Sequence, residues 1–367
     1  MSYLDRIRFT VDDLAKRSLL RDVRAAVPAD AIDFSSNDYL GMAREPAILA
    51  ALHAAQRVGS GGSRLLSGAH PEHVALEADL AAWTGRERAL LFSSGYLAVL
   101  GAIVTLAPFV EAIASDQRNH ACAIDAVRLT SVPRSIYAHD AYVPNRRVPT
   151  MVVTESLFGM TGTRVDIGAM LAKLGPSDIL VVDEAHALGV AGPRGAGFCA
   201  PFADPRIVVI GTLSKALGGA GGFVAGMRDA IAYLATAART FVFDTAMPPA
   251  LASALRVALA HVASDDGDAR RAVIRAHARA LVAELAAIGI AVPASDGPIV
   301  PIPIGDAAVA LAIGRDLEAR GIFAPAIRPP TVPRGESQLR VTLRSDHTHA
   351  DIRAFARALA AALVTTQ

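Results

Sequence analysis

Short apolar runs alternate with longer amphipathic segments between residues 89 and 225, and this alternation constrains the fold more than any other feature of the chain. The runs lie at 89–92, 151–153, 179–182 and 207–210. Strands that are buried on both faces read as continuous apolar runs, and parallel strands need long, usually helical, connections. The pattern therefore predicts an α/β fold in which helices cover both faces of a mostly parallel sheet.

The composition changes after the acidic segment 264–268. An Ala/Arg-rich helix, a proline-punctuated strand (298–304), another helix, a strand (338–343) and a final helix follow. With 367 residues, the chain is also long for one compact domain. We expect an N-terminal segment (1–45) with an amphipathic helix at about 4–24, a large domain (46–263) and a smaller α+β domain (264–367).

Charge and cysteine content argue against several classes of protein. The 36 Lys and Arg residues balance 35 acidic ones, so the net charge of +1 offers no general attraction for nucleic acid or an anionic membrane. Cys122 and Cys199 are too few and too far apart for a disulfide framework or a zinc knuckle. Charged residues interrupt the first 24 positions, and the apolar stretch 97–110 is shorter than the ~20 residues that span a bilayer. We expect a cytoplasmic protein, with 97–110 as a buried helix.

Polar residues follow two of the expected strands where each strand ends. Asp183 and His186 follow the run 179–182, and Lys215 follows 207–210 in a glycine-containing turn. Ligands of parallel sheets gather beyond the carboxyl ends of the strands, so these three side chains are expected to converge.

Other chemistries explain this convergence less well. The tetrapeptide Asp-Glu-Ala-His at 183–186 also occurs in helicases, but the chain has no G-x-x-x-x-G-K-[ST] loop and no basic surplus. It has no G-x-S-x-G nucleophile elbow, and His186 has no ligands at metal spacing. Taken singly, a lysine after a strand is usually solvated, an aspartate there usually caps a helix, and His120 or His186 is more often structural.

Pyridoxal 5'-phosphate accounts for the residues jointly. Its aldehyde needs a lysine, its pyridine nitrogen needs a carboxylate, and its phosphate needs backbone amides at a helix start. Lys215 and Asp183 supply the first two groups, and Thr212 could add a hydroxyl. A helix is expected to start directly after the strand 89–92, at Ser94, Gly95 and Tyr96.

Over nearly its whole length the chain resembles the α-oxoamine synthases, which are fold-type I pyridoxal phosphate enzymes. The resemblance implies a large domain with a mostly parallel sheet and a smaller α+β C-terminal domain. The matching segments are Ser35-Ser36-Asn37-Asp38-Tyr39-Leu40-Gly41, Gly59-Ser60-Gly61-Gly62-Ser63-Arg64, Ser67-Gly68 with His73 and Leu76-Glu77, Ser94-Gly95-Tyr96, Asp183-Glu184-Ala185-His186 with Gly189, Gly192, Gly195 and Gly197, and Thr212-Leu213-Ser214-Lys215.

Two proline-containing motifs refine the resemblance. Met247-Pro248-Pro249 and the segment 327–333 (Ile-Arg-Pro-Pro-Thr-Val-Pro) look like those of the members that join L-alanine to a pimeloyl thioester in biotin biosynthesis. The acyl carrier, coenzyme A or acyl carrier protein, stays open. So do two alternatives: a related synthase that uses glycine or serine with another acyl thioester, and a cofactor-binding paralogue without turnover.

The family's roles carry over to matching positions. Lys215 would bind the cofactor covalently and then remove the Cα proton, Asp183 would pair with the pyridinium nitrogen, and His120 would stack on the ring. His186 would lie near the cofactor's phenolic oxygen. Thr245 resembles a residue that reaches the phosphate of the neighbouring subunit, which implies a homodimer with shared active sites.

The resemblance also implies residues that bind substrate. Asn37 and Arg340 would hold the amino-acid carboxylate, for which a guanidinium is suited in charge and geometry. Arg328, between Ile327 and two prolines, is a further candidate. An N-terminal arginine of the family also touches substrate, and Arg21 and Arg24 fit that position equally poorly.

Three positions depart from the family's pattern. Gly159 stands where a serine is usual, which removes a hydroxyl expected near the phenolic oxygen. Asp244 replaces a small hydroxyl residue and brings a like charge towards the phosphate. The segment 97–99 lacks the usual asparagine. These changes bear on rate and substrate and leave Lys215, Asp183 and His186 intact.

Overall fold

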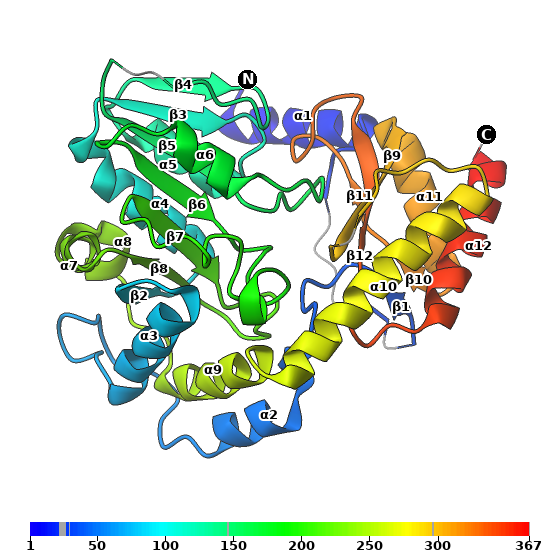
Figure 1. Cartoon of the computed structure of the whole chain (residues 1–367). Helices are drawn as coiled ribbons and strands as arrows, with labels where there is room; N and C mark the ends of the chain where they lie inside the picture. The colour runs from blue at the N-terminus through cyan, green and yellow to red at the C-terminus, as the bar shows by residue number, and fades with distance from the viewer. Residues whose placement is uncertain (22–26, 29, 145–146, 296, 367) are drawn as a thin grey trace. The chain divides into compact units, whose positions relative to one another are not determined.

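The protein is described from a computed structural model that covers residues 1–21, 27–28, 30–144, 147–295 and 297–366. Two compact units form (Figure 1). The large unit comprises Asp38–Gly159 and Thr163–Arg271, and the small unit comprises Met1–Asn37, Met160–Gly162 and Ala272–Gln367. The first 37 residues thus group with the C-terminal third, while the three-part division at 45 and 263 stays a prediction.

The large unit is built on a seven-stranded sheet in the order β2-β8-β7-β6-β5-β3-β4. Strands β7, β6, β5, β3 and β4 run parallel, whereas β8 is antiparallel to both of its neighbours. The predicted mostly parallel α/β sheet is confirmed. The strand bounds are β2 Arg88–Phe92, β3 Ala112–Asp116, β4 Arg134–Tyr137, β5 Thr150–Glu155, β6 Ile179–Asp183, β7 Ile207–Thr212 and β8 Gly222–Gly226.

Helices cover both faces of this sheet (Figure 1). Successive residues of a strand point to opposite faces, so Val182 packs into one hydrophobic cluster and Val181 into the other. The first cluster includes residues of α3, α6 and α9, and the second includes residues of α4, α5, α7 and α8. The helix bounds are α2 Pro46–His53, α3 Pro71–Thr84, α4 Gly95–Leu106, α5 Ala121–Leu129, α6 Ile167–Lys173, α7 Arg228–Ala237, α8 Arg239–Val242 and α9 Pro249–Val262, with short 3-10 turns η1 Met42–Arg44, η2 Ala107–Phe109 and η3 Pro193–Gly195.

Helix α4 and the turn η2 cover the apolar stretch that the sequence predicted as a buried helix. Ile103 and Leu106 are buried in the second cluster. Among the described residues, no helix has the length and apolar character needed to cross a membrane.

The small unit contains a three-stranded antiparallel sheet in the order β11-β12-β9 and a separate parallel pair of β1 and β10. The predicted strands at 298–304 and 338–343 correspond to β9 and β12. Helix α10 crosses from the large unit into this one. The bounds are α1 Tyr3–Lys16, β1 Ile32–Asp33, α10 Asp265–Ala287, β9 Ile299–Gly305, α11 Ala307–Ala319, β10 Ile322–Phe323, β11 Ala326–Ile327, β12 Ser337–Thr342 and α12 His349–Thr366.

The N-terminal helix is shorter than predicted. It starts at Tyr3 behind a capping box made by Ser2 and Asp5, and it ends at Lys16 rather than near residue 24. Ser18 has a φ of 55°, in the left-handed region that does not continue an α-helix. The predicted continuation at 22–24 lies outside the described residues.

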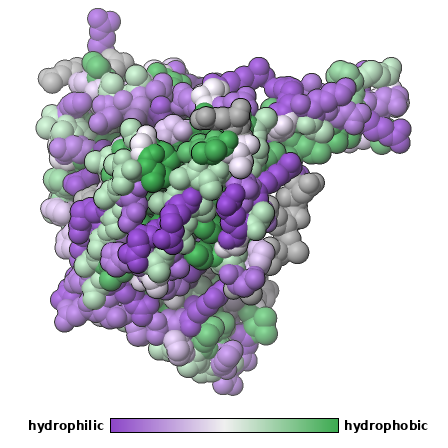
Figure 2. Space-filling view, turned by 90° about the vertical axis from the view of Figure 1, so that its right-hand side faces the viewer, coloured by the Kyte–Doolittle hydropathy of each residue, from purple (hydrophilic) through white to green (hydrophobic). Residues whose placement is uncertain are grey.

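The surface on the side drawn at the right of Figure 1 carries both hydrophilic and hydrophobic residues (Figure 2). Hydrophilic residues lie among smaller hydrophobic areas, as is usual for folded proteins, whose surfaces retain much apolar area.

Candidate active site

The carboxyl ends of β6 and β7 lie side by side and open into a cavity of about 250 Å³. Asp183 at the end of β6 pairs in register with Ile210 of β7, so the residues that follow both strands meet at one edge of the sheet. All residues predicted to contact the cofactor, except Thr245, line this cavity: Ser94, Gly95, Tyr96, His120, Asp183, His186, Thr212 and Lys215. The predicted convergence is therefore present in the large unit.

Lys215 and His186 are in direct contact. The Lys215 Nζ lies 2.8 Å from Nε2 of His186, and Nδ1 of the same ring lies 2.6 Å from the hydroxyl of Tyr39. Tyr39 and His186 are both buried. The sequence assigned Tyr39 only to a motif, and no spacing rule signalled that its hydroxyl reaches His186.

Asp183 is oriented by the backbone that follows it. Its Oδ1 accepts a hydrogen bond from the Ala185 N–H at 2.9 Å. Its negative charge also acts on Glu155. This residue is the last of β5 and pairs in register with Asp183 on the neighbouring strand. Burial, and secondly the charge of Asp183, raise the pKa of Glu155 to about 8.

Glu155 lines the same cavity, and sequence reasoning missed it. Its carboxylate accepts backbone N–H groups from His120, at 2.8 Å, and Gly159, at 3.2 Å. A signal was available, because Glu155 is a charged residue directly after the apolar run 151–153, the same pattern that identified Asp183.

His120 stands at the N-terminus of α5. Its backbone N–H donates to the Glu155 side chain. Its ring Nδ1 accepts a hydrogen bond from the Cys122 N–H at 3.3 Å and lies 2.9 Å from Cys122 Sγ. Desolvation lowers the pKa of His120, and the nearby Asp183 opposes this effect. The ring is therefore favoured in its neutral form, which is suited to stacking on a planar ligand.

The N-terminus of α4 forms one wall of the cavity. Ser94 caps the helix by accepting the Leu97 N–H at 3.2 Å, and the amides of the first turn have no acceptor within the helix. A Cβ on Gly95 would meet Thr212 at 3.1 Å, a tighter contact than most Cβ atoms make, so glycine favours this close approach. Thr212 Oγ1 lies 2.7 Å from Ser214 Oγ. A helix start with two hydroxyls suits a phosphate group.

Thr245 and Asp244 line a separate small recess, together with Arg64 and His73. Asp244 is hydrogen-bonded to the Ser93 hydroxyl, whereas the Arg239 guanidinium lies over the Phe243 ring at 4.8 Å. Ser93 is thus the neighbour that accommodates the Asp244 carboxylate.

The predicted substrate-binding residues belong to the small unit. Arg340, only 4% exposed, donates to Asn37 Oδ1 and to Thr342 Oγ1, both at 3.0 Å. The Arg340 and Asn37 side chains therefore act as a pair.

Arg328 and Arg21 form a second group in the small unit. Arg328 donates to the Ser18 carbonyl, and Arg21 donates to the Arg328 carbonyl at 3.3 Å. Burial, and then the positive charge of Arg21, lower the pKa of Arg328. Arg24 lies outside the described residues.

The cavity of the large unit fits pyridoxal 5'-phosphate. It offers an amine for an aldehyde, a carboxylate for a pyridinium nitrogen, a helix start for a phosphate, and enough volume for a ring between His120 and the ends of β6 and β7. The residues predicted to hold the cofactor line this one cavity, apart from Thr245.

Comparisons with known proteins agree with this geometry. The family model "Aminotransferase class I and II" matches residues 29–359. An 8-amino-7-oxononanoate synthase from Burkholderia thailandensis is 41% identical over 355 residues, which cover 91% of this chain and 88% of the relative.

Solved structures are similar over almost the whole chain. A high-resolution structure of SPT with a PLP internal aldimine superimposes with a TM-score of 0.89 at 26% identity, covering 100% of this chain and 99% of that one. An 8-amino-7-oxononanoate synthase from Francisella tularensis gives a TM-score of 0.77 at 25% identity, covering 91% and 98%. The predicted fold-type I architecture is confirmed, and the chain belongs to the aminotransferase class I and II family and, within it, to the 8-amino-7-oxononanoate synthases.

Proposed function

We propose that this chain condenses L-alanine with a pimeloyl thioester to give 8-amino-7-oxononanoate, carbon dioxide and the free thiol carrier, with pyridoxal 5'-phosphate as its cofactor. The observation that carries the proposal is the meeting of Lys215, Asp183 and His186 in one cavity beyond the ends of β6 and β7. The name and high identity of the relatives support the choice of substrates.

Bound in this cavity, pyridoxal phosphate supplies an electron sink that stabilises negative charge on the amino acid's Cα. Lys215 Nζ holds the cofactor and then accepts the Cα proton, for which the amine must be neutral. The Asp183 carboxylate keeps a proton on the pyridine nitrogen by charge pairing. His120 covers one ring face and excludes water from it.

Arg340 and Asn37 bind the amino-acid carboxylate in this proposal. The planar guanidinium offers two parallel N–H groups, which match the two oxygens of a carboxylate. Arg328 and Arg21 are the candidates for contacts with the acyl substrate.

The proposed active enzyme is a homodimer in which Thr245 donates its hydroxyl to the phosphate in the partner's site. This predicts complementation between two inactive variants. When Lys215→Ala and Thr245→Val chains are mixed and allowed to exchange, one site in each mixed dimer has both wild-type groups, and activity should return. Mixtures that stay inactive although mass spectrometry shows mixed dimers would contradict sharing of the site.

The main experiment compares amino acids and acyl donors on the cofactor-loaded protein. L-alanine, glycine and L-serine are each supplied with pimeloyl-CoA and with pimeloyl acyl carrier protein, and the product is identified by mass spectrometry. We expect 8-amino-7-oxononanoate from L-alanine, with loss of one carbon dioxide. Product from glycine or serine alone would replace this proposal by a sister synthase.

Lys215→Ala is the control for the mechanism. It should abolish turnover and covalent retention of the cofactor, while its thermal unfolding stays close to that of the wild type without cofactor. Turnover that survives this substitution would overturn the central role of Lys215.

A further inference from the structure

The His186 ring is held between two side chains that approach its two nitrogens. The Tyr39 hydroxyl lies 2.6 Å from Nδ1, and Lys215 Nζ lies 2.8 Å from Nε2. Both distances are those of hydrogen bonds, so the position of each partner restrains the rotation of the ring.

Gly159 leaves the space that this ring occupies. A Cβ built on Gly159 would overlap Nε2 and the neighbouring carbons of His186. The backbone at this position is fixed, because the Gly159 N–H donates to Glu155 at 3.2 Å and the Phe158 N–H donates to the Thr163 carbonyl at 2.9 Å. A side chain at 159 and the observed pose of His186 therefore exclude each other.

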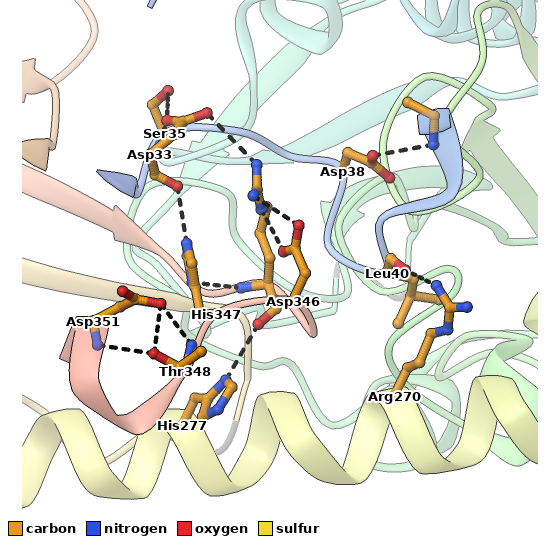
Figure 3. Close-up of polar contacts among 12 residues, drawn as sticks. Asp33, Ser35, Asp38, Leu40, Arg270, His277, Asp346, His347, Thr348 and Asp351 are labelled. Carbon is orange, nitrogen blue, oxygen red and sulfur yellow. Dashed lines mark hydrogen bonds and ion pairs between the residues drawn. The ribbon is translucent and has the colours of Figure 1, made fainter. Parts of the chain in front are cut away.

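Tyr39 is also fixed, because the backbone on either side of it is anchored (Figure 3). The Asp38 carboxylate accepts the Met42 N–H at 2.8 Å, and the Leu40 carbonyl accepts a hydrogen bond from Arg270 at 2.8 Å. Tyr39 itself is fully buried. Its hydroxyl therefore presents a rigid partner to His186 rather than a mobile one.

The Tyr39 hydroxyl can donate to Nδ1 or accept its proton, and this choice sets the role of Nε2. In a neutral imidazole one nitrogen donates and the other accepts, and the partner of one decides the role of the other. A hydroxyl that donates to Nδ1 leaves the proton on Nε2, and the Nε2–H then points at Lys215. A neutral amine can accept that hydrogen bond and an ammonium cannot.

We propose that Tyr39 and Gly159 are positioning residues for His186. Tyr39 fixes the ring in the tautomer with its proton on Nε2, and Gly159 supplies the room for the ring to face Lys215. The inference rests on the proposed function, in which Lys215 acts as the base. It also gives a reason for glycine at position 159, where the family usually has a serine: the glycine leaves room for the His186 ring.

The test is ¹⁵N NMR of the histidine-labelled chain, both without and with pyridoxal phosphate, with the His186 signals assigned by their loss in His186→Asn. In the wild type we expect a protonated Nε2 and an unprotonated, hydrogen-bonded Nδ1. Tyr39→Phe should replace this pattern by a mixture of tautomers, and Gly159→Ala should displace the ring and abolish the pattern as well.

Matched controls separate positioning from general damage. Tyr137→Phe removes another hydroxyl of the large unit, one that donates to the Val153 carbonyl, and Gly168→Ala adds a methyl group that meets the Phe202 ring at 3.2 Å. Neither residue lines the cavity. Both controls should keep the wild-type His186 signals.

Kinetics supply a second readout. Tyr39→Phe should lower kcat with L-alanine about tenfold, as expected for loss of one hydrogen bond to a working group, and change KM by less than about twofold. A wild-type His186 with its proton on Nδ1, or a Tyr39→Phe spectrum equal to that of the wild type, would overturn the inference. A wild type that shows the expected tautomer and no turnover would instead contradict the proposed function.

Discussion

Glu155 and His120 are joined by a hydrogen bond from the His120 backbone N–H to Glu155 Oε1, with a length of 2.8 Å. The other oxygen of the same carboxylate accepts the Gly159 N–H at 3.2 Å. One buried side chain thus ties the start of α5, which borders the cavity, to the loop after β5. Glu155 is accordingly a positioning residue for His120 and, through Gly159, for His186.

Replacing Glu155 by alanine should weaken binding of pyridoxal phosphate. The substitution leaves two backbone donors without their acceptor, and an unsatisfied buried hydrogen-bonding group costs about 1–3 kcal/mol. We expect the dissociation constant of the cofactor, measured by equilibrium dialysis, to rise at least about tenfold.

Glu87→Ala is the matched control for Glu155. Glu87 also accepts a backbone N–H, from Arg228 at 2.9 Å, but it does so at an exposed position outside the cavity. This variant should bind the cofactor as the wild type does. Equal cofactor affinities for the Glu155 and Glu87 variants would remove the positioning role of Glu155.

The ion pair of Arg64 and Glu77 should stabilise the fold. The pair is bidentate at 2.8 and 3.0 Å, both side chains are less than 15% exposed (11% and 13%), and Glu77 also accepts the Leu91 N–H. Removing one partner of a buried pair leaves an uncompensated charge, so Glu77→Ala should cost about 3 kcal/mol of unfolding free energy in a urea titration.

A second ion pair that involves α3, but is more exposed, serves as the control for Glu77→Ala. Asp79 and Arg256 approach to 2.6 Å with side chains that are 38% and 46% exposed. Because solvent screens such pairs, Asp79→Ala should cost less than about 1 kcal/mol. A loss as large as that of Glu77→Ala would show that helix α3, rather than burial of the pair, determines the effect.

The sequence predicted the parts of the fold that follow from burial. Runs such as 179–182 and 207–210 are strands with both faces covered, and their apolar composition is the direct result. Strand β4, whose first three residues are exposed, lacks this composition and was missed. Strand β8 was also missed, although its residues 223–225 form a short buried apolar run between two glycines.

The candidate site was predicted where position along the chain implies position in space. Asp183 and Lys215 follow parallel strands, so their convergence was predictable. The contact of Tyr39 with His186 joins residues 147 positions apart through a loop, and no periodicity carries that information. The crowding of His186 by a Cβ at 159 likewise depends on the ring's rotation, which only the folded structure gives.

Arg340→Lys should weaken binding of L-alanine. The Arg340 guanidinium is a planar fork held by Asn37 and Thr342, and a lysine ammonium replaces that fork by a single point charge. We expect KM for L-alanine to rise about tenfold to a hundredfold.

Arg344→Lys controls for a change of arginine elsewhere in the small unit. Arg344 pairs with Asp346 at 2.8 Å, and its variant should keep the wild-type KM. If Arg340→Lys alters only the KM of the acyl donor, Arg340 belongs to the acyl-binding residues instead.

Glu184 should make stability depend on pH. Its side chain is fully buried, and it accepts the Phe198 N–H at 2.7 Å and the Cys199 N–H at 3.2 Å. Burial raises the pKa of Glu184 to about 7, although the hydrogen bonds from the Phe198 and Cys199 N–H groups oppose the shift. The folded chain therefore keeps this proton up to about pH 7, whereas the unfolded chain releases it near pH 4.5, the usual value for a glutamate.

Between these two pH values the folded state binds more protons than the unfolded state, so this group makes stability fall as the pH rises. Glutamine at 184 stays neutral at every pH and removes that contribution, while the histidines titrate alike in both proteins and cancel in the difference. The unfolding free energy of Glu184→Gln minus that of the wild type should increase from about pH 5 to about pH 7 and stay constant above it. A difference that is independent of pH in urea titrations would mean that Glu184 is ionised throughout, with its hydrogen bonds outweighing its burial.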